Sequence, residues 1–195
     1  MEDIILTGPK HSGKTHTGKA LARLCSDTCG CSCDRSISCV FIDIDETIQQ
    51  KTGKTPRKLF NEGKEVFQKA EADAAAALFT STFSDNASSC CAGQQRRIIA
   101  AGGGIIDNQG AMAVLKNSGA KIVYLNISAN LAWRRIYGRG SKELPPFLQT
   151  ENPQETHRVL HERRSAAYLE LADIVIDAES KTPEEIAAEI IKHIC

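Results

Sequence analysis

The stretch Gly8-Pro9-Lys10-His11-Ser12-Gly13-Lys14-Thr15 decides the fold, because G-x-x-x-x-G-K-[ST] is the pattern of a phosphate-binding P-loop. It follows the apolar run Ile4-Ile5-Leu6 and leads into residues 13–24, where apolar side chains recur at helical spacing. A strand, a glycine turn and a helix are the context that the motif requires. In that context backbone N–H groups and the positive end of the helix converge on a polyphosphate. The sequence therefore predicts a site for a nucleoside triphosphate.

The side chains of this loop are assigned to the nucleotide and its metal ion. Lys14 is expected to reach the β- and γ-phosphates and to act in catalysis, and the hydroxyl of Thr15 is expected to ligand Mg²⁺. An ordinary glycine-rich turn is the alternative, which the flanking strand and helix disfavour. The residues expected to bind the nucleotide are His11, Ser12, Gly13, Lys14, Thr15 and His16.

Composition excludes several classes of protein. The chain has 195 residues, which suffices for one domain with a substantial core. Lys plus Arg and Asp plus Glu number 24 each, so no basic field for nucleic acid is expected. No apolar run has membrane-spanning length, and Met1-Glu2-Asp3 lacks the basic start of a signal peptide. We therefore expect a cytoplasmic protein without nucleic-acid or membrane partners.

Eight cysteines are a high count for one domain, and most of them are clustered. Five lie between residues 25 and 39, two are adjacent and one ends the chain: Cys25, Cys29, Cys31, Cys33, Cys39, Cys90, Cys91 and Cys195. Reduced thiols are expected in a cytoplasmic nucleotide-binding protein. A soft metal ion on Cys29, Cys31 and Cys33 is the alternative, although C-x-C-x-C is not the spacing of structural zinc sites.

Apolar periodicity predicts an α/β domain in which short strands alternate with helices around a parallel sheet. Five strands are predicted, at residues 4–6, 39–42, 97–101, 121–125 and 173–176. Six helices are predicted, at residues 13–24, 62–79, 109–117, 129–137, 153–171 and 183–193. Three of the helices start with the capping residues Ser128, Asn152 and Thr182, and proline follows the last two. Two polar stretches, 26–38 and 80–95, are predicted to be loop insertions in a single domain spanning residues 1–195.

Two aspartates follow the second predicted strand, in the run Phe41-Ile42-Asp43-Ile44-Asp45. Ligands of doubly wound sheets lie at the carboxyl ends of strands, so Asp43 and Asp45 are expected beside the phosphates. Alternation along an extended chain is expected to point both side chains the same way. One carboxylate would hold Mg²⁺ through water, and the other would accept or position the proton of an attacking hydroxyl. The alternative for Asp45 is a cap on the next helix.

Three successive glycines, Gly102, Gly103 and Gly104, follow the third predicted strand. A run of this kind lets a ligand approach bare backbone and its N–H donors. A plain turn is the alternative. Because the run ends a strand, we expect it at the ligand-binding edge of the sheet.

Several motifs occur in a fixed order: the P-loop, Phe41-x-Asp43-x-Asp45, Gly-Lys-Glu-x-Phe at 63–67, the three glycines, Val-Tyr-Leu at 123–125, and Leu160-x₃-Arg164-x₃-Tyr168. In this combination the chain resembles the shikimate kinase family of P-loop enzymes, over nearly its whole length outside the two insertions. The resemblance implies a three-layer P-loop kinase fold, with a five-stranded parallel sheet flanked by helices. It also implies a small substrate-binding subdomain at about 44–79 and a lid at about 138–152. The implied activity is phosphorylation of the 3-hydroxyl of shikimate by ATP with Mg²⁺, in a chain that we expect to be a monomer.

The resemblance also implies roles for individual residues. Thr15 would ligand Mg²⁺ directly, and Asp43 would do so through water. Asp45 would bind the substrate hydroxyls, Arg164 would bind the substrate carboxylate, and Arg135 would lie against the adenine. The residues implied to touch the substrate are Asp45, Gln68, Gly102, Gly103, Gly104 and Arg164.

Two positions depart from the family's pattern. The family usually has an arginine directly after the motif phenylalanine, where this chain has Gln68, and an amide cannot form the charged, bidentate pair with a carboxylate. In the lid, Pro145 stands where a phosphate-contacting arginine is expected; Arg139 and Lys142 are the candidates to replace it, and Arg139 is assigned to catalysis. These departures leave two alternatives open: a kinase for another polyhydroxylated acid, such as a gluconate-like one, and a nucleotide-binding module without turnover.

Overall fold

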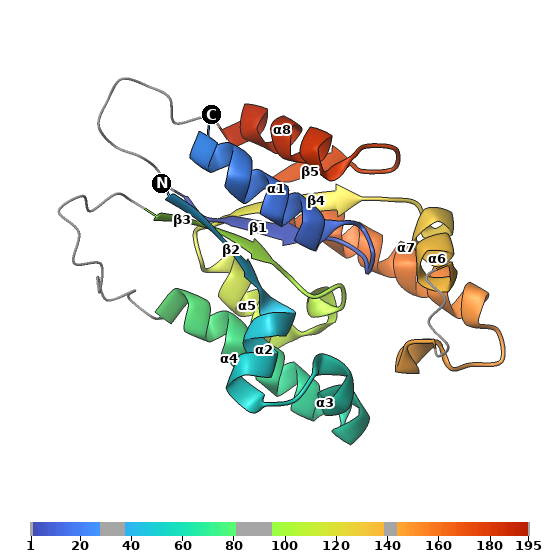
Figure 1. Ribbon diagram of the computed structural model, residues 1–195. Coiled ribbons are helices and arrows are strands. Elements are labelled where there is room, and N and C mark those ends of the chain that lie inside the picture. The colour runs from blue at the N-terminus through green and yellow to red at the C-terminus, as the bar shows by residue number, and fades with distance from the viewer. Residues whose placement is uncertain (1, 28–37, 81–94, 139–143, 195) are drawn as a thin grey trace.

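The computed structural model describes residues 2–27, 38–80, 95–138 and 144–194 (Figure 1). Its centre is a parallel sheet of five strands in the order β2-β3-β1-β4-β5. The strands are β1 (Ile4–Thr7), β2 (Ser38–Asp43), β3 (Gln95–Ala100), β4 (Lys121–Asn126) and β5 (Ile174–Asp177). In the central strand, Ile4 pairs with Ile98 of β3 on one side and with Lys121 of β4 on the other. All pairs are parallel, so each connection crosses over the sheet through helical segments.

Helices connect the strands and cover both faces of the sheet. They are α1 (Lys14–Asp27), α2 (Ile44–Thr52), α3 (Pro56–Glu62), α4 (Lys64–Thr80), α5 (Gln109–Lys116), α6 (Ala129–Tyr137), α7 (Pro153–Leu171) and α8 (Pro183–Ile194). Two short 3₁₀ helices, η1 (Ile105–Asp107) and η2 (Pro146–Leu148), precede α5 and α7.

Two apolar cores lie on opposite faces of the sheet. Ile4 and Leu6 of β1 pack in one core with residues of α1 and α8, and Ile5 packs in the other with residues of α2, α4 and α5. This division follows from the alternation of side chains along a strand. Figure 1 shows α1 and α8 on one side of the sheet and α4 and α5 on the other. The predicted fold class, a three-layer α/β domain around a five-stranded parallel sheet, is confirmed.

Every strand and helix predicted from the sequence has a counterpart, and α6 and α7 have the predicted bounds. The predicted caps are present as well. Ser128 Oγ accepts the N–H of Leu131 at 3.1 Å, and Asn152 Oδ1 accepts the N–H of Glu155 at 3.3 Å. Thr182 caps α8 in the same way.

The segment between β2 and α4 corrects the prediction in two respects. Residues 44–62 form the two helices α2 and α3, neither of which was predicted. The helix predicted at 62–79 begins at Lys64, because Gly63 closes α3 by donating its N–H to the carbonyl of Leu59 at 3.2 Å. Gly53 ends α2 in the left-handed conformation, at φ 68°, which glycine adopts without steric penalty.

The ends of both predicted insertions, 26–38 and 80–95, belong to helices and strands instead of loops. Ser26 and Asp27 belong to α1, and Ser38 begins β2. Thr80 belongs to α4, and Gln95 begins β3. The remainder of the insertions, 28–37 and 81–94, lies outside the described residues.

Candidate active site

The P-loop joins β1 to α1 through a backbone that only certain residues can adopt. Gly8, His11 and Gly13 have φ angles of 136°, 64° and 99°. A Cβ at Gly8 would lie 2.7 Å from the carbonyl oxygen of Leu125, so β4 and the loop can approach this closely only with glycine there. The loop therefore wraps over the carboxyl ends of β1 and β4, where its N–H groups can face a phosphate.

Lys14 holds this loop in shape. Its Nζ donates to the carbonyl oxygens of Gly8 and Pro9, both at 2.8 Å, and the side chain is buried. Burial lowers the pKa of Lys14 to about 8, against the opposing effect of the Asp45 and Asp43 carboxylates. A bound polyphosphate would stabilise the charged form of Lys14, because its oxygens are anionic whereas the carbonyl oxygens of Gly8 and Pro9 are neutral.

A cavity of about 260 Å³ lies on the α1 side of the loop. Arg135 of α6 lines it and donates from Nη1 to the carbonyl of His11 at 2.9 Å, which ties α6 to the P-loop. The structure thus brings Arg135 together with residues assigned to the nucleotide, and adds five that were not assigned, of which Lys181 is the cation. The residues lining this cavity are His11, Ser12, Gly13, His16, Thr17, Arg135, Ala178, Lys181, Pro183 and Ile186.

Thr15 and Asp43 form the pair predicted to hold Mg²⁺. Thr15 Oγ1 donates to Asp43 Oδ2 at 3.0 Å, directly behind the loop. A hydroxyl and a carboxylate are the oxygen donors that Mg²⁺ prefers beside phosphates, so these two residues fit the ion.

Asp45 occupies a different local structure from the one predicted. β2 ends at Asp43 and α2 begins at Ile44, so Asp45 lies in the first turn of a helix and the expected alternation along a strand is wrong. Asp43 is the helix cap, since its Oδ1 accepts the N–H of Asp45 at 3.0 Å. The Asp45 side chain is thereby left to face the next cavity. Burial raises the pKa of Asp45 above its ordinary value, and the Asp43 carboxylate adds to the rise.

A larger cavity, of about 380 Å³, adjoins the loop on the side of α3, α4 and α7. Its wall includes Lys10 and His11 of the P-loop, Asp45 of α2, and the three glycines after β3. Close packing against the P-loop backbone requires glycine at one position of this run, Gly103. A Cβ at Gly103 would lie 2.7 Å from the backbone nitrogen of Lys10, and one at Gly102 would lie 2.9 Å from Glu71 Oε1. The cavity residues are Lys10, His11, Asp45, Pro56, Arg57, Phe60, Lys64, Phe67, Gln68, Glu71, Gly102, Gly103, Gly104, Asp107, Ile136, Pro145, Phe147 and Arg164.

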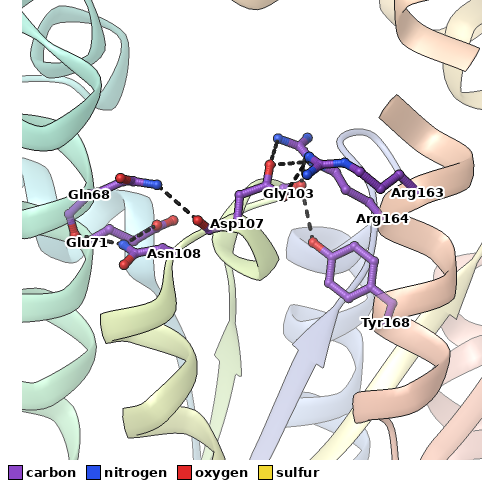
Figure 2. A network of polar contacts seen from close by, with 8 residues as sticks. All are labelled: Gln68, Glu71, Gly103, Asp107, Asn108, Arg163, Arg164 and Tyr168. Atoms are coloured by element: carbon purple, nitrogen blue, oxygen red, sulfur yellow. Dashed lines mark hydrogen bonds and ion pairs between the residues drawn. The ribbon is translucent and has the colours of Figure 1, made fainter. Parts of the chain in front are cut away.

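Arg164 and Gln68 meet at Asp107, a residue that the sequence did not single out (Figure 2). Arg164 donates to Asp107 Oδ2 from Nε at 2.9 Å and from Nη2 at 2.6 Å, and to the carbonyl of Gly103 at 3.3 Å. Gln68 Nε2 donates to the backbone carbonyl of Asp107 at 3.0 Å. The two residues assigned to the substrate carboxylate therefore lie on either side of one aspartate.

Glu71 is a second cavity residue that sequence reasoning missed. It is completely buried, its Oε2 accepts from Asn108 Nδ2 at 2.9 Å, and its Oε1 has no hydrogen-bond partner in the described part of the chain. Burial raises the pKa of Glu71 to about 7, although the hydrogen bond from Asn108 opposes the shift. The sequence did contain a signal for this residue. Glu71 lies three positions after Gln68, on the helix face that continues into the core residues Ala74 and Ala75, so an acidic side chain was to be expected at a buried position.

The remaining residues considered from the sequence lie away from this cavity or outside the described ranges, with one exception. Pro145 is this exception and lines the cavity. Arg139 and Lys142 lie outside the described residues, as do Cys29, Cys31, Cys33, Cys90, Cys91 and Cys195. Cys25 and Cys39 pack against the core on the α1 side of the sheet, and within the described ranges no three His, Cys, Asp or Glu side chains gather as a metal site. None of the helices described is long and apolar enough to cross a membrane.

A phosphate-binding loop, the Thr15–Asp43 pair behind it and a cavity lined by loop residues and Asp45 define a class of protein, the P-loop phosphotransferases. Comparison with known proteins gives the family. The model described as shikimate kinase matches residues 10–195, and the chain therefore belongs to the shikimate kinase family, which confirms the resemblance found in the sequence.

Individual relatives agree with this assignment. The shikimate kinase of Thermodesulfovibrio yellowstonii is 31% identical over 194 residues, covering 99% of this chain and 95% of the relative. The solved shikimate kinase of Acinetobacter baumannii, in complex with shikimate, is 28% identical with a TM-score of 0.76, covering 100% of this chain and 93% of its own. That of Aquifex aeolicus is 25% identical with a TM-score of 0.69, covering 98% and 95%.

Proposed function

We propose that this chain transfers the γ-phosphoryl group of ATP to the 3-hydroxyl of shikimate, giving 3-phosphoshikimate and ADP. The observation that carries the proposal is the cavity of about 380 Å³, whose wall runs from the P-loop residues Lys10 and His11 to Arg164. A ring acid held by Arg164 would thereby present its hydroxyls to the triphosphate. The relative solved with shikimate, 28% identical over this whole chain, supports shikimate as the acceptor.

The P-loop side chains carry the donor half of the reaction. Lys14 would exchange the carbonyls of Gly8 and Pro9 for phosphate oxygens, and would neutralise charge that moves onto the β–γ bridging oxygen. Thr15 and Asp43 would hold Mg²⁺, which when bound neutralises the phosphates. Arg135 would lie beside the nucleotide through its contact with His11.

Asp45 carries the acceptor half. The acceptor oxygen forms a bond to the γ-phosphorus as the bond to the bridging oxygen breaks, and Asp45 takes or positions the hydroxyl proton. The same carboxylate orients the hydroxyl in line, together with the backbone of Gly102, Gly103 and Gly104. Gln68 and Arg164 would bind the far, carboxylate end.

The lid and the oligomeric state complete the proposal. Residues 138–152 would close over the nucleotide and exclude water that would otherwise hydrolyse ATP. Arg139 would contact the transferring phosphoryl group in place of the lid arginine that Pro145 replaces. The chain would act as a monomer, and the P-loop, Asp45 and Arg164 line one cavity without residues from a second copy.

An acceptor panel tests this function. ADP release from magnesium ATP would be followed with shikimate, with gluconate and without an acceptor. We expect saturable release that depends on shikimate and greatly exceeds the acceptor-free rate. Release with gluconate but not with shikimate would assign a different acceptor. Tight ATP binding without release for any acceptor would identify a nucleotide-binding module.

A further inference from the structure

We propose, building on the function above, that Asp107 is a specificity-determining residue whose carboxylate competes with the carboxylate of the acceptor for the guanidinium of Arg164. Two contacts of 2.9 and 2.6 Å join the guanidinium to Asp107 Oδ2, and a third, of 3.3 Å, joins it to the carbonyl of Gly103. The two side chains are only 18% and 21% exposed, so water screens the pair weakly. Figure 2 shows the aspartate between Arg164 and Gln68, where the acceptor carboxylate is expected.

Contacts other than the one to Arg164 hold Asp107 in this position. Its backbone N–H donates to the carbonyl of Gly104 at 3.0 Å, and its own carbonyl accepts from Gln68 Nε2 at 3.0 Å. Its Oδ1 accepts from Arg163 Nη2 at 2.8 Å. Arg163 is 63% exposed and could keep this bond when Arg164 turns to another anion. The aspartate therefore bridges two arginines, and only one of them faces the acceptor cavity.

The charges at this end of the cavity nearly cancel before an acceptor arrives. The positive charge of Arg164 meets the negative charge of Asp107, and Gln68 contributes a dipole without a net charge. Glu71, which lies behind Gly102, has a pKa raised to about 7 by burial and so carries little charge below neutral pH. The other cationic side chains of the cavity lie toward the P-loop, α3 and α4: Lys10, Arg57 and Lys64.

The binding free energy that an acceptor carboxylate gains from Arg164 is therefore reduced by the free energy of the Arg164–Asp107 contact that it replaces. The consequence is a high KM for a carboxylate acceptor and weak discrimination against an acceptor that has a neutral group in its place. The rate of the transfer itself is not affected, because Asp107 is not among the residues that face the phosphates.

The variant Asp107→Asn tests the competition directly, since it keeps the shape and the backbone contacts and removes the charge. We expect the KM for shikimate to fall about tenfold, with kcat and the KM for ATP changing less than about twofold. The KM or inhibition constant of the carboxamide of shikimate should change less than about twofold, because this analogue has no charge to compete. Asp73→Asn, the same change at an exposed position of α4, serves as the matched control and should alter none of these constants.

A binding titration keeps this test separate from the test of the acceptor. Calorimetry measures the affinity of the wild type and of Asp107→Asn for shikimate, whether or not either protein is catalytically active. Tighter binding of shikimate, but not of its carboxamide, supports the competition. The competition is overturned if Asp107→Asn and Asp107→Ser both bind shikimate equally or more weakly than the wild type, and both melt as cooperatively. Asp107 would then be a residue that orients Arg164. Absence of turnover with shikimate in the wild type would instead contradict the proposed function.

Discussion

Glu71 is a carboxylic acid in the protein interior, and the change Glu71→Gln shows whether its proton is retained near neutral pH. The residue is 0% exposed, and the one hydrogen bond that its side chain makes within the described residues comes from Asn108 at 2.9 Å. Burial raises the pKa from its ordinary 4.5 to about 7. Glutamine has nearly the same shape, can still accept from Asn108 and does not titrate.

The sign of the effect follows from which state holds the proton. Below pH 4.5 the Glu71 carboxyl is protonated in both the folded and the unfolded chain. Between pH 4.5 and about 7 only the folded chain keeps the proton, so the free energy of unfolding falls as the pH rises, and above about 7 it levels off. At about 1.4 kcal/mol for each pH unit, the loss over this window is about 3 kcal/mol.

Urea unfolding across this pH range measures the loss. We expect the unfolding free energy of the wild type to fall by about 3 kcal/mol relative to that of Glu71→Gln as the pH rises from 4.5 to about 7. Subtracting the variant removes the contributions of the titrating groups that do not interact with Glu71. Glu170→Gln, at an exposed position of α7, is the matched control and should follow the wild type at every pH. Parallel curves for the wild type and Glu71→Gln would show that the buried carboxyl does not retain its proton, and would refute the reasoning.

Three further substitutions address the proposed reaction. Lys14→Ala should lower kcat by a factor of about 10³ or more, because the phosphates lose their buried cation. The control Lys19→Ala, on the exposed face of α1, should leave the rate of ADP release unchanged. Full activity of Lys14→Ala would remove the basis for the P-loop role. Asp45→Asn should lower kcat by about 10²- to 10⁴-fold with ATP affinity, measured by calorimetry, nearly unchanged; parallel loss of both would make Asp45 a nucleotide residue instead. Gln68→Arg should lower the KM for shikimate about tenfold in steady-state assays, since it adds a charged donor beside Arg164, and an unchanged or raised KM would argue for a different acceptor.

Sequence reasoning succeeded where the signal was local. The P-loop combines a fixed motif with its own strand and helix, and the helices at 153–171 and 183–193 begin with a capping residue followed by proline. Thr55-Pro56 is the same signal and begins α3, so that helix was open to prediction. α2 was harder to predict, because its nine residues bury only Ile44 and Ile48 and show little periodicity.

The missed residues of the site depend on contacts between distant parts of the chain. Arg164 meets Asp107 across 57 positions, and Glu71 meets Asn108 across 37. No local pattern reports such a contact. The orientation of Asp45 was predicted wrongly for a different reason. The alternation of side chains holds only in an extended chain, and the chain changes from strand to helix at Ile44, before Asp45 is reached.

Phosphorus NMR of one reaction mixture tests the central claim most directly. With purified protein, magnesium ATP and shikimate, we expect a new phosphate monoester resonance to grow in equal amount with ADP, and its coupling to a ring proton to place the ester at the 3-position. Formation of ADP with inorganic phosphate alone, or no change in the ATP signals at all, would contradict phosphoryl transfer to shikimate by this chain.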